Sequence, residues 1–131
     1  MGTGSGKLKV FAGRRANLVV FDAATTQTRA LKKIMAAAVR AGARVRPAHG
    51  PVEVRIWTSV MTEKAGAHDV DNVAKAVLDA LDGVFYLDDR QVVRLVSERF
   101  FGSANRIAAR VTQLDGPVEE VELSEALLGQ P

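Results

Sequence analysis

The amino-acid sequence predicts an α+β fold, in which a mixed β-sheet carries helices packed on one face as a two-layer sandwich. Two segments show the three- and four-residue apolar spacing of helices, and several shorter ones alternate between apolar and polar residues as strands do. The 131 residues, 47% of them hydrophobic, suffice for one core and not for two. We therefore expect one domain over residues 7–114, a flexible lead over residues 1–6 and an acidic tail over residues 115–131.

The chain is expected to begin with a hairpin and a helix. Residues 7–11 and 18–21 are short apolar or alternating stretches on either side of a basic turn at residues 13–17. Residues 25–41 are rich in Ala, Leu, Lys and Arg with helical apolar spacing, and Gly42 stands where a helix C-cap would.

A strand, a loop and a second helix follow. Residues 52–58 alternate as in a half-buried strand, and residues 61–68 read as a polar loop. A second helix is expected over residues 71–81, because its apolar residues form a stripe at helical spacing, and Gly83 can end this helix.

The last third of the chain is expected to hold two more strands. A short apolar segment at residues 84–87 leads to an acidic pair, after which residues 91–100 alternate, and residues 107–114 are the last strand candidate. With hairpins at both ends of the chain, the order of elements favours a mixed sheet covered on one face.

Composition and charge limit the function classes. The chain has no cysteine, so a metal would be held by oxygen or imidazole ligands, which favours hard cations. No segment has the length of a membrane span or the order of a signal peptide, so we expect a cytoplasmic protein.

The charges are distributed unevenly along the chain. Residues 1–68 hold 12 Lys and Arg against 3 Asp and Glu, whereas residues 69–131 hold 6 Lys and Arg against 12 Asp and Glu. A basic half suits a polyanion such as nucleic acid, although a solvated surface can show the same bias.

Acidic residues gather at the start of the second helix. Asp69, Asp71 and Asn72 could serve only as caps, because such side chains accept hydrogen bonds from free N–H groups. Asp71, Lys75 and Asp79 share one helical face, where ion pairs on a solvated surface would be unremarkable. Structural and functional interpretations both remain open from this segment alone.

A second acidic pair, Asp88 and Asp89, precedes the strand at residues 91–100. If these residues face Asp69 and Asp71, the carboxylates would repel one another unless a cation or a lysine lay between them. Mg²⁺ prefers such oxygen ligands, and its bound water can attack a phosphodiester. Lys75 could neutralise the phosphate, but an isolated Asp-Asp pair is more often an acidic turn.

Three motifs in this region together resemble the RusA family of Holliday junction resolvases. They are a D-x-D-N-x-x-K helix start at residues 69–75, a D-A-L-x-G helix end at residues 79–83 and a D-D-x-Q-V strand entry at residues 88–92. The resemblance is strong over residues 69–99. The preceding helix and strand agree in pattern.

The resemblance implies a RusA-like fold and a homodimeric, Mg²⁺-dependent endodeoxyribonuclease that resolves four-way junctions by paired symmetrical nicks in DNA recombination and repair. Mn²⁺ could substitute for Mg²⁺. Such a protein would be associated with the nucleoid and could be encoded by a prophage or a phage. The implied site residues are the metal-binding catalytic acids Asp69, Asp71 and Asp89, the catalytic lysine Lys75, and the supporting residues Asp88 and Asp79.

Basic residues outside this segment are candidates for contacts with the DNA backbone, which position DNA without reading its sequence. Arg99 falls where the family often has a lysine near the junction. Residues 12–16 stand where many members have a Pro-rich or Lys-Gly-Arg-Pro segment. The remaining candidates are Arg14, Arg15, Arg44, Arg46 and Lys64.

Other interpretations fit parts of the sequence. A nuclease for other branched or flap DNA would share every motif. A non-catalytic branched-DNA-binding protein would use the acidic residues only as caps and surface charges, and an interaction module would use the acidic tail.

His68 is expected to be a loop residue. Core or dimer packing, rather than base stacking, is expected for the aromatic residues Trp57, Phe85, Tyr86, Phe100 and Phe101.

Overall fold

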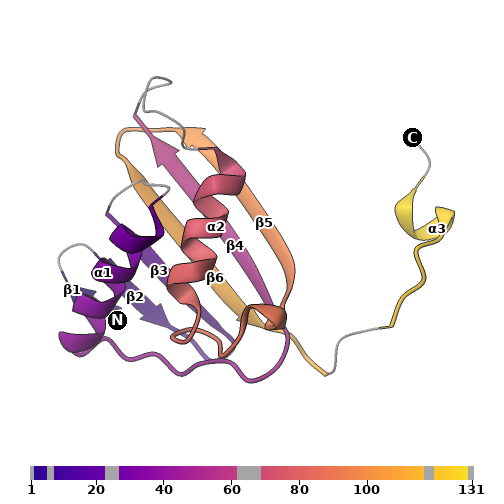
Figure 1. Ribbon diagram of the computed structural model, residues 1–131, viewed down its shortest axis with the longest axis horizontal. Helices are drawn as coiled ribbons and strands as arrows, with labels where there is room; N and C mark the ends of the chain where they lie inside the picture. Colours follow the sequence, from indigo (N-terminus) through magenta and orange to yellow (C-terminus); the bar gives the residue numbers. More distant parts are fainter. Residues whose placement is uncertain (1, 6–7, 23–26, 62–68, 117–119, 130–131) are drawn as a thin grey trace.

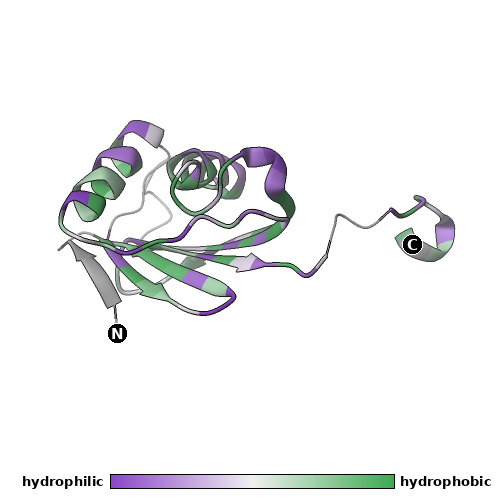
Figure 2. Cartoon of the chain, turned by 90° about the horizontal axis from the view of Figure 1, so that it is seen from below, coloured by the Kyte–Doolittle hydropathy of each residue, from purple (hydrophilic) through white to green (hydrophobic). Residues whose placement is uncertain are grey.

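The computed structural model describes residues 2–5, 8–22, 27–61, 69–116 and 120–129. A six-stranded mixed sheet, ordered β1-β2-β3-β6-β4-β5, carries both long helices on one face (Figures 1 and 2). The expected α+β fold with helices on one face is therefore confirmed. The strands are β1 (Gly2–Ser5), β2 (Leu8–Ala12), β3 (Ala16–Phe21), β4 (Val52–Val60), β5 (Val92–Phe101) and β6 (Arg106–Gln113), and the helices are α1 (Thr28–Arg40), α2 (Val70–Leu81), the 3-10 turn η1 (Asp89–Gln91) and α3 (Glu125–Leu128).

The predicted N-terminal hairpin is present, because β2 and β3 pair as antiparallel neighbours. Its turn needs a glycine: the Gly13 N–H donates to the Ala16 carbonyl at 2.9 Å, and a Cβ at Gly13 would lie 2.7 Å from that oxygen. Residues 2–5, expected to be a flexible lead, pair with β2 as β1.

Helix α1 forms where the apolar spacing predicts it. It buries Leu31, Met35 and Ala38 against the sheet, and the chain leaves it through Gly42, whose positive φ of 98° favours glycine. The first residues of the expected helix, 25 and 26, lie outside the described residues.

The C-terminal half differs from the prediction. β5 pairs in parallel with β4, and β6 pairs with β3 and β4, so the hairpin expected between the last two strands is wrong. Parallel strands require a crossover, and α2 provides it between β4 and β5. Alternation identifies strands but not their neighbours, which is why the sequence pattern misplaced β5.

The core lies between the sheet and the helices. Along β4 every second residue from Val52 to Val60 is buried, and α2 presents an apolar stripe to the same layer. Because α2 runs back across the sheet, its first residue lies near the end of β4 and its last residue near the start of β5. The two ends of α2 therefore lie at opposite ends of the sheet.

The aromatic residues behave in two ways. Phe85 and Tyr86 are fully buried, as expected for core packing. Trp57 is half-buried on the sheet face away from the helices, where two arginine guanidinium groups each lie 5.1 Å from its ring centroid. Phe100 and Phe101 are 44% and 58% exposed, so they do not belong to the core of a single chain.

The acidic tail leaves the domain after β6. Its described residues from position 120 onward are exposed and include the single turn α3, which lies away from the sheet in Figure 1. None of the helices in the described part of the chain is long and apolar enough to cross a membrane.

Candidate active site

The start of α2 presents two exposed carboxylates. Asp69 has the extended backbone of an N-cap residue, but its side chain accepts no capping hydrogen bond. Its only described side-chain partner is the Asn72 amide, 3.4 Å away. Asp71 follows in the first helical turn, exposed and without an ion pair to any described residue. Among the described residues, a capping hydrogen bond therefore accounts for neither carboxylate.

The exposed face of α2 continues with Lys75 and Asp79. Lys75 is exposed and forms no ion pair with a described residue, so the expected Lys75–Asp79 pair is not formed. The hydroxyl of Thr28 on α1 donates to Asp79 instead, at 3.5 Å. The Lys75 ammonium group is therefore accessible to a phosphate group.

The acidic pair after α2 is held in the turn η1. Asp88 caps this turn, and the Gln91 side chain accepts from the Asp88 N–H to complete a capping box. The Asp88 carboxylate also pairs with the Arg90 guanidinium at 3.1 Å. The hydrogen bonds from Arg90 lower the Asp88 pKa. These contacts make Asp88 a structural residue of the turn.

Asp89 points toward other acids. Partial burial raises its pKa first, and the negative charges of Asp82, Asp79 and Asp88 raise it further. Asp89 thus lies against the C-terminal end of α2, and not against Asp71 at the other end. Asp82 was missed by the sequence analysis, although its spacing of three residues from Asp79 places both on one helical face.

The raised pKa of Asp89 predicts a pH-dependent change in stability for Asp89→Asn. The native protein binds the Asp89 proton more tightly than the unfolded chain does, so ionisation of this carboxyl destabilises the fold as the pH rises above 3.8. The variant should therefore have the higher Tm at pH 7 in the absence of metal, and this gain should disappear toward pH 3. Thermal unfolding followed by circular dichroism measures both, and an equal Tm difference at the two pH values would contradict the prediction.

The length of α2 separates the predicted metal ligands. Asp71 and Asp82 are 11 residues apart on a helix, which corresponds to about 16 Å along its axis. Among the described residues, no three carboxylate or imidazole side chains are placed to hold one metal ion. One chain therefore does not bring Asp69, Asp71 and Asp89 together, and their role as joint ligands stays a prediction.

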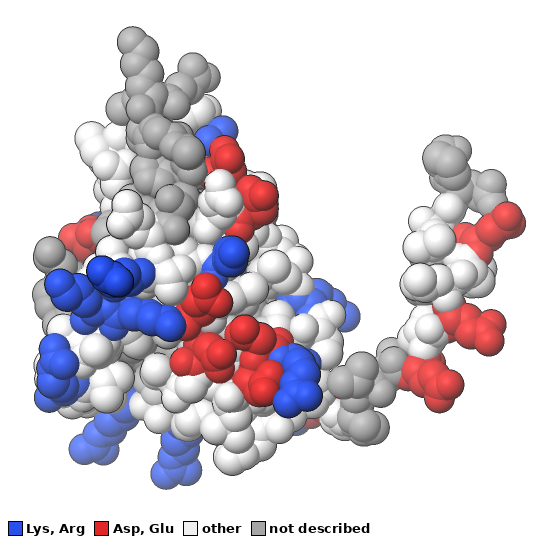
Figure 3. Space-filling model, in the orientation of Figure 1, with Lys and Arg blue, Asp and Glu red and all other residues white. Residues whose placement is uncertain are grey.

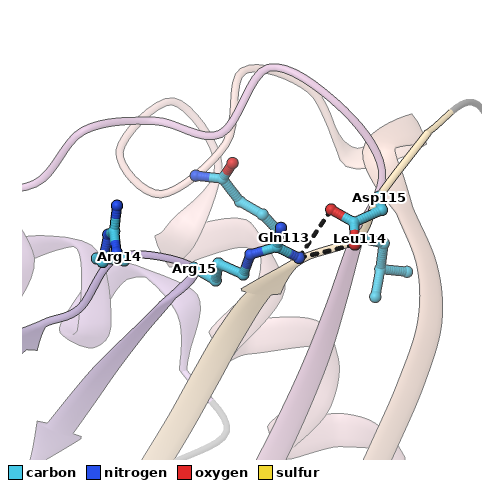
Figure 4. Close-up of a pocket in the computed structure, with 5 residues that line it drawn as sticks. All are labelled: Arg14, Arg15, Gln113, Leu114 and Asp115. Carbon is cyan, nitrogen blue, oxygen red and sulfur yellow. Dashed lines mark hydrogen bonds and ion pairs between the residues drawn. The ribbon is translucent and has the colours of Figure 1, made fainter.

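The basic hairpin turn lies at the Asp89 end of the sheet. The Gln113 N–H donates to the Arg15 carbonyl at 2.7 Å, and Val52 of β4 pairs with both Gln113 and Val92. The Arg15 guanidinium contacts Asp115 at 2.7 Å beside a hollow of about 560 Å³, whereas Arg14 points away from this pair (Figure 4).

Further basic side chains flank α2. Figure 3 shows Lys and Arg gathered over α1, beside the acidic side chains of α2 and η1. The exposed basic residues of α1 are Arg29, Lys32, Lys33 and Arg40. The sequence analysis did not nominate them, although their positions on the polar face of a helix were a usable signal. Arg99 lies exposed on β5, with its guanidinium 6.0 Å from the Phe101 ring centroid, and Lys64 and His68 lie outside the described residues.

Fold and site together define a class of protein. A small sheet-and-helix domain that exposes carboxylates next to basic side chains has what a metal-assisted enzyme acting on nucleic acid requires. The chain belongs to the RusA endodeoxyribonuclease family, because the model of that family, described as Endodeoxyribonuclease RusA, matches residues 9–112. The protein is accordingly an endodeoxyribonuclease, a hydrolase that acts on DNA. No curated protein sequence matches the chain significantly.

Proposed function

We propose that this protein resolves four-way DNA junctions by paired symmetrical nicks, as a Mg²⁺-dependent homodimer that serves DNA recombination and repair. One observation carries the proposal: Asp69 and Asp71 are exposed at the start of α2 without a capping role. In an endodeoxyribonuclease, exposed carboxylates that do not cap a helix are candidates for catalysis. The two-fold symmetry of a four-way junction suits a C2 dimer with one active site for each cut strand.

The residues present fit a hard divalent cation. Carboxylate oxygens are the ligands that Mg²⁺ prefers, and Asp89 lies near the carboxylates of Asp79, Asp82 and Asp88, whose negative charge a cation would compensate. In the proposed site Asp69, Asp71 and Asp89 hold the metal, for which Mn²⁺ could substitute. When bound, the ion makes a coordinated water more acidic and stabilises negative charge on phosphate oxygens.

The other side chains position the DNA and its charge. Lys75, exposed one helical turn from Asp71, neutralises the charge that develops on the phosphate in the transition state. The basic residues of α1 and of the turn around Arg14 contact the backbone, which fixes the register of the junction without reading its sequence. Asp88 supports the site by holding the turn that presents Asp89.

The test is cleavage of a labelled synthetic four-way junction beside linear duplex and flap DNA, with Mg²⁺ and with EDTA. We expect paired nicks at symmetrical positions of the junction only, and only with Mg²⁺. Equal cutting of flap DNA would favour a broader branched-DNA nuclease. Junction binding without cutting would favour a non-catalytic DNA-binding protein.

A further inference from the structure

The acidic tail carries apolar side chains that the described part of the domain leaves exposed. Leu123 and Leu128 are 82% and 70% exposed, and they stand among the exposed acidic residues Glu120, Glu122 and Glu125. A single helical turn such as α3 is not stable in water unless it packs against other residues. A segment that is both acidic and apolar is suited to docking on a surface that is basic and apolar.

A groove between α1 and α2 is such a surface. It has a volume of about 380 Å³ and mainly apolar walls, and ligand pockets typically measure about 300–1,000 Å³. The apolar residues that line it are Met35, Ala36, Val39, Ala80 and Val84. Val39 is 47% exposed, so an apolar side chain laid over it would remove two apolar surfaces from water at once.

The two sides of the groove carry opposite charges. Lys32 and Arg40 stand on the α1 side, whereas Asp79 and Asp82 stand on the α2 side. Lys32 and Arg40 are exposed and form no ion pair with a described residue. An acidic segment in the groove is therefore attracted to α1 and repelled from α2.

The tail can reach this groove, because both lie at the same end of the sheet. The Leu114 N–H donates to the Pro51 carbonyl at 2.9 Å, and the Ala48 N–H donates to the Phe85 carbonyl at 2.9 Å. The tail thus leaves the domain beside the segment that joins α1 to β4, and this segment also contacts the turn after α2. Extended chain from Leu114 to Leu123 spans about 30 Å, whereas α1 is about 20 Å long.

We propose that residues 120–129 dock in the groove between α1 and α2 of their own chain. The leucines of this segment cover Val39, and its glutamates pair with Lys32 and Arg40. Figure 1 shows the segment away from the sheet, so the docked tail is a second position of the same residues. The docked tail covers basic residues of α1 and therefore competes with DNA for them. This competition rests on the proposed function, which assigns those residues to the DNA backbone, whereas the docking itself does not.

The first test detects the docked tail by a disulfide, because the natural chain has no cysteine. Val39→Cys combined with Leu128→Cys should form a disulfide within one chain under mild oxidation. The product is identified by its mobility on a non-reducing gel and by mass spectrometry of the linked peptides.

The matched control combines Leu128→Cys with Phe11→Cys. Phe11 is 40% exposed on the sheet face away from the helices. It lies in the same hairpin as Arg15, which contacts Asp115 at the start of the tail, so an undocked tail reaches it as well. The pair with Val39→Cys should oxidise at least about tenfold faster than the control, because docking raises the effective concentration of the two thiols. Equal rates, or disulfides that join two chains, would overturn the proposed docking.

The second test measures the competition with DNA in the full-length chain. Leu123→Ser combined with Leu128→Ser keeps every charge of the tail and removes its apolar contact. Affinity for a labelled four-way junction in EDTA should rise by about tenfold, because a surface that is uncovered in about one chain in ten binds about tenfold more weakly. A tail that only repels DNA by its charge would leave the affinity at the wild-type value, and that result would overturn the proposal. Phe11→Ser is the matched apolar control and should not change the affinity.

Val39→Ser tests the same contact from the groove side. It should raise junction affinity as much as the two leucine substitutions do, and the combination of all three should raise it no further, because both sides remove one interaction. Additive gains would contradict docking at Val39. A wild-type protein that neither binds nor cuts junctions would instead contradict the proposed function, while the disulfide test would still decide whether the tail docks.

Discussion

Asp71→Asn is expected to reduce junction cleavage by roughly a thousandfold, which corresponds to about 4 kcal/mol of lost transition-state stabilisation. The substitution removes the negative charge of a proposed metal ligand but keeps the size of the side chain. Junction affinity in EDTA should be unchanged or higher, because a negative charge near the phosphates has been removed. Single-turnover cleavage and gel-shift binding on the same labelled junction measure the two effects separately.

The matched control is Asp22→Asn. Asp22 is an exposed aspartate whose only described pairing is with Arg106 at 3.4 Å, and such surface pairs contribute little to stability. This control should cut at the wild-type rate. If Asp71→Asn folds but loses binding and cleavage to the same extent, Asp71 contributes to DNA binding rather than to metal chemistry.

The sequence predicts the layers of the fold well, because burial leaves a periodic signal. The alternation at Val52–Thr58 and the apolar stripe of α2 arise from packing against one core, so each identifies an element without knowledge of its neighbours. The order of the strands in the sheet leaves no such periodic signal. β5 carries apolar residues on both faces, and its parallel pairing with β4 depends on the α2 crossover and not on any local pattern.

The sequence nominated candidate site residues but did not predict their arrangement. The family resemblance proposes Asp69, Asp71 and Asp89 as a set, and sequence distance does not reveal that α2 holds them apart. The sequence left open whether Asp88 and Asp89 face Asp69 and Asp71, and within one chain Asp89 lies near Asp82 instead. The position of a side chain after a helix depends on the turn that follows, and that turn is fixed by contacts distant in sequence.

Those distant contacts converge on Gln91, whose role the sequence did not reveal. Its side-chain oxygen accepts from the Leu87 and Asp88 N–H groups at 2.7 and 2.9 Å. Its side-chain nitrogen donates to the Ala48 and Gly50 carbonyls at 2.8 and 2.9 Å. One amide therefore ties the turn η1 to the segment that precedes β4, because a side-chain amide carries an accepting oxygen and a nitrogen with two donor hydrogens.

Gln91→Ala is expected to lower the free energy of unfolding by about 2 kcal/mol, because four hydrogen bonds are lost and water can replace some of them. Cleavage at a temperature where the variant is folded should fall by about ten- to a hundredfold, because Asp89 is no longer held in place. The Mg²⁺ concentration for half-maximal activity should rise as well, which a purely structural loss would not cause.

Gln113→Ala is the control for this substitution. Gln113 is an exposed glutamine at the end of β6 whose backbone, rather than its side chain, makes the described contact with Arg15. It should change neither stability nor Mg²⁺ dependence. Gln91→Glu keeps the accepting oxygen and loses the donor, so its unfolding free energy and Mg²⁺ requirement should lie between those of the wild type and Gln91→Ala. If Gln91→Ala lowers stability while the Mg²⁺ requirement of the folded enzyme stays at the wild-type value, Gln91 supports the fold and has no part in positioning Asp89.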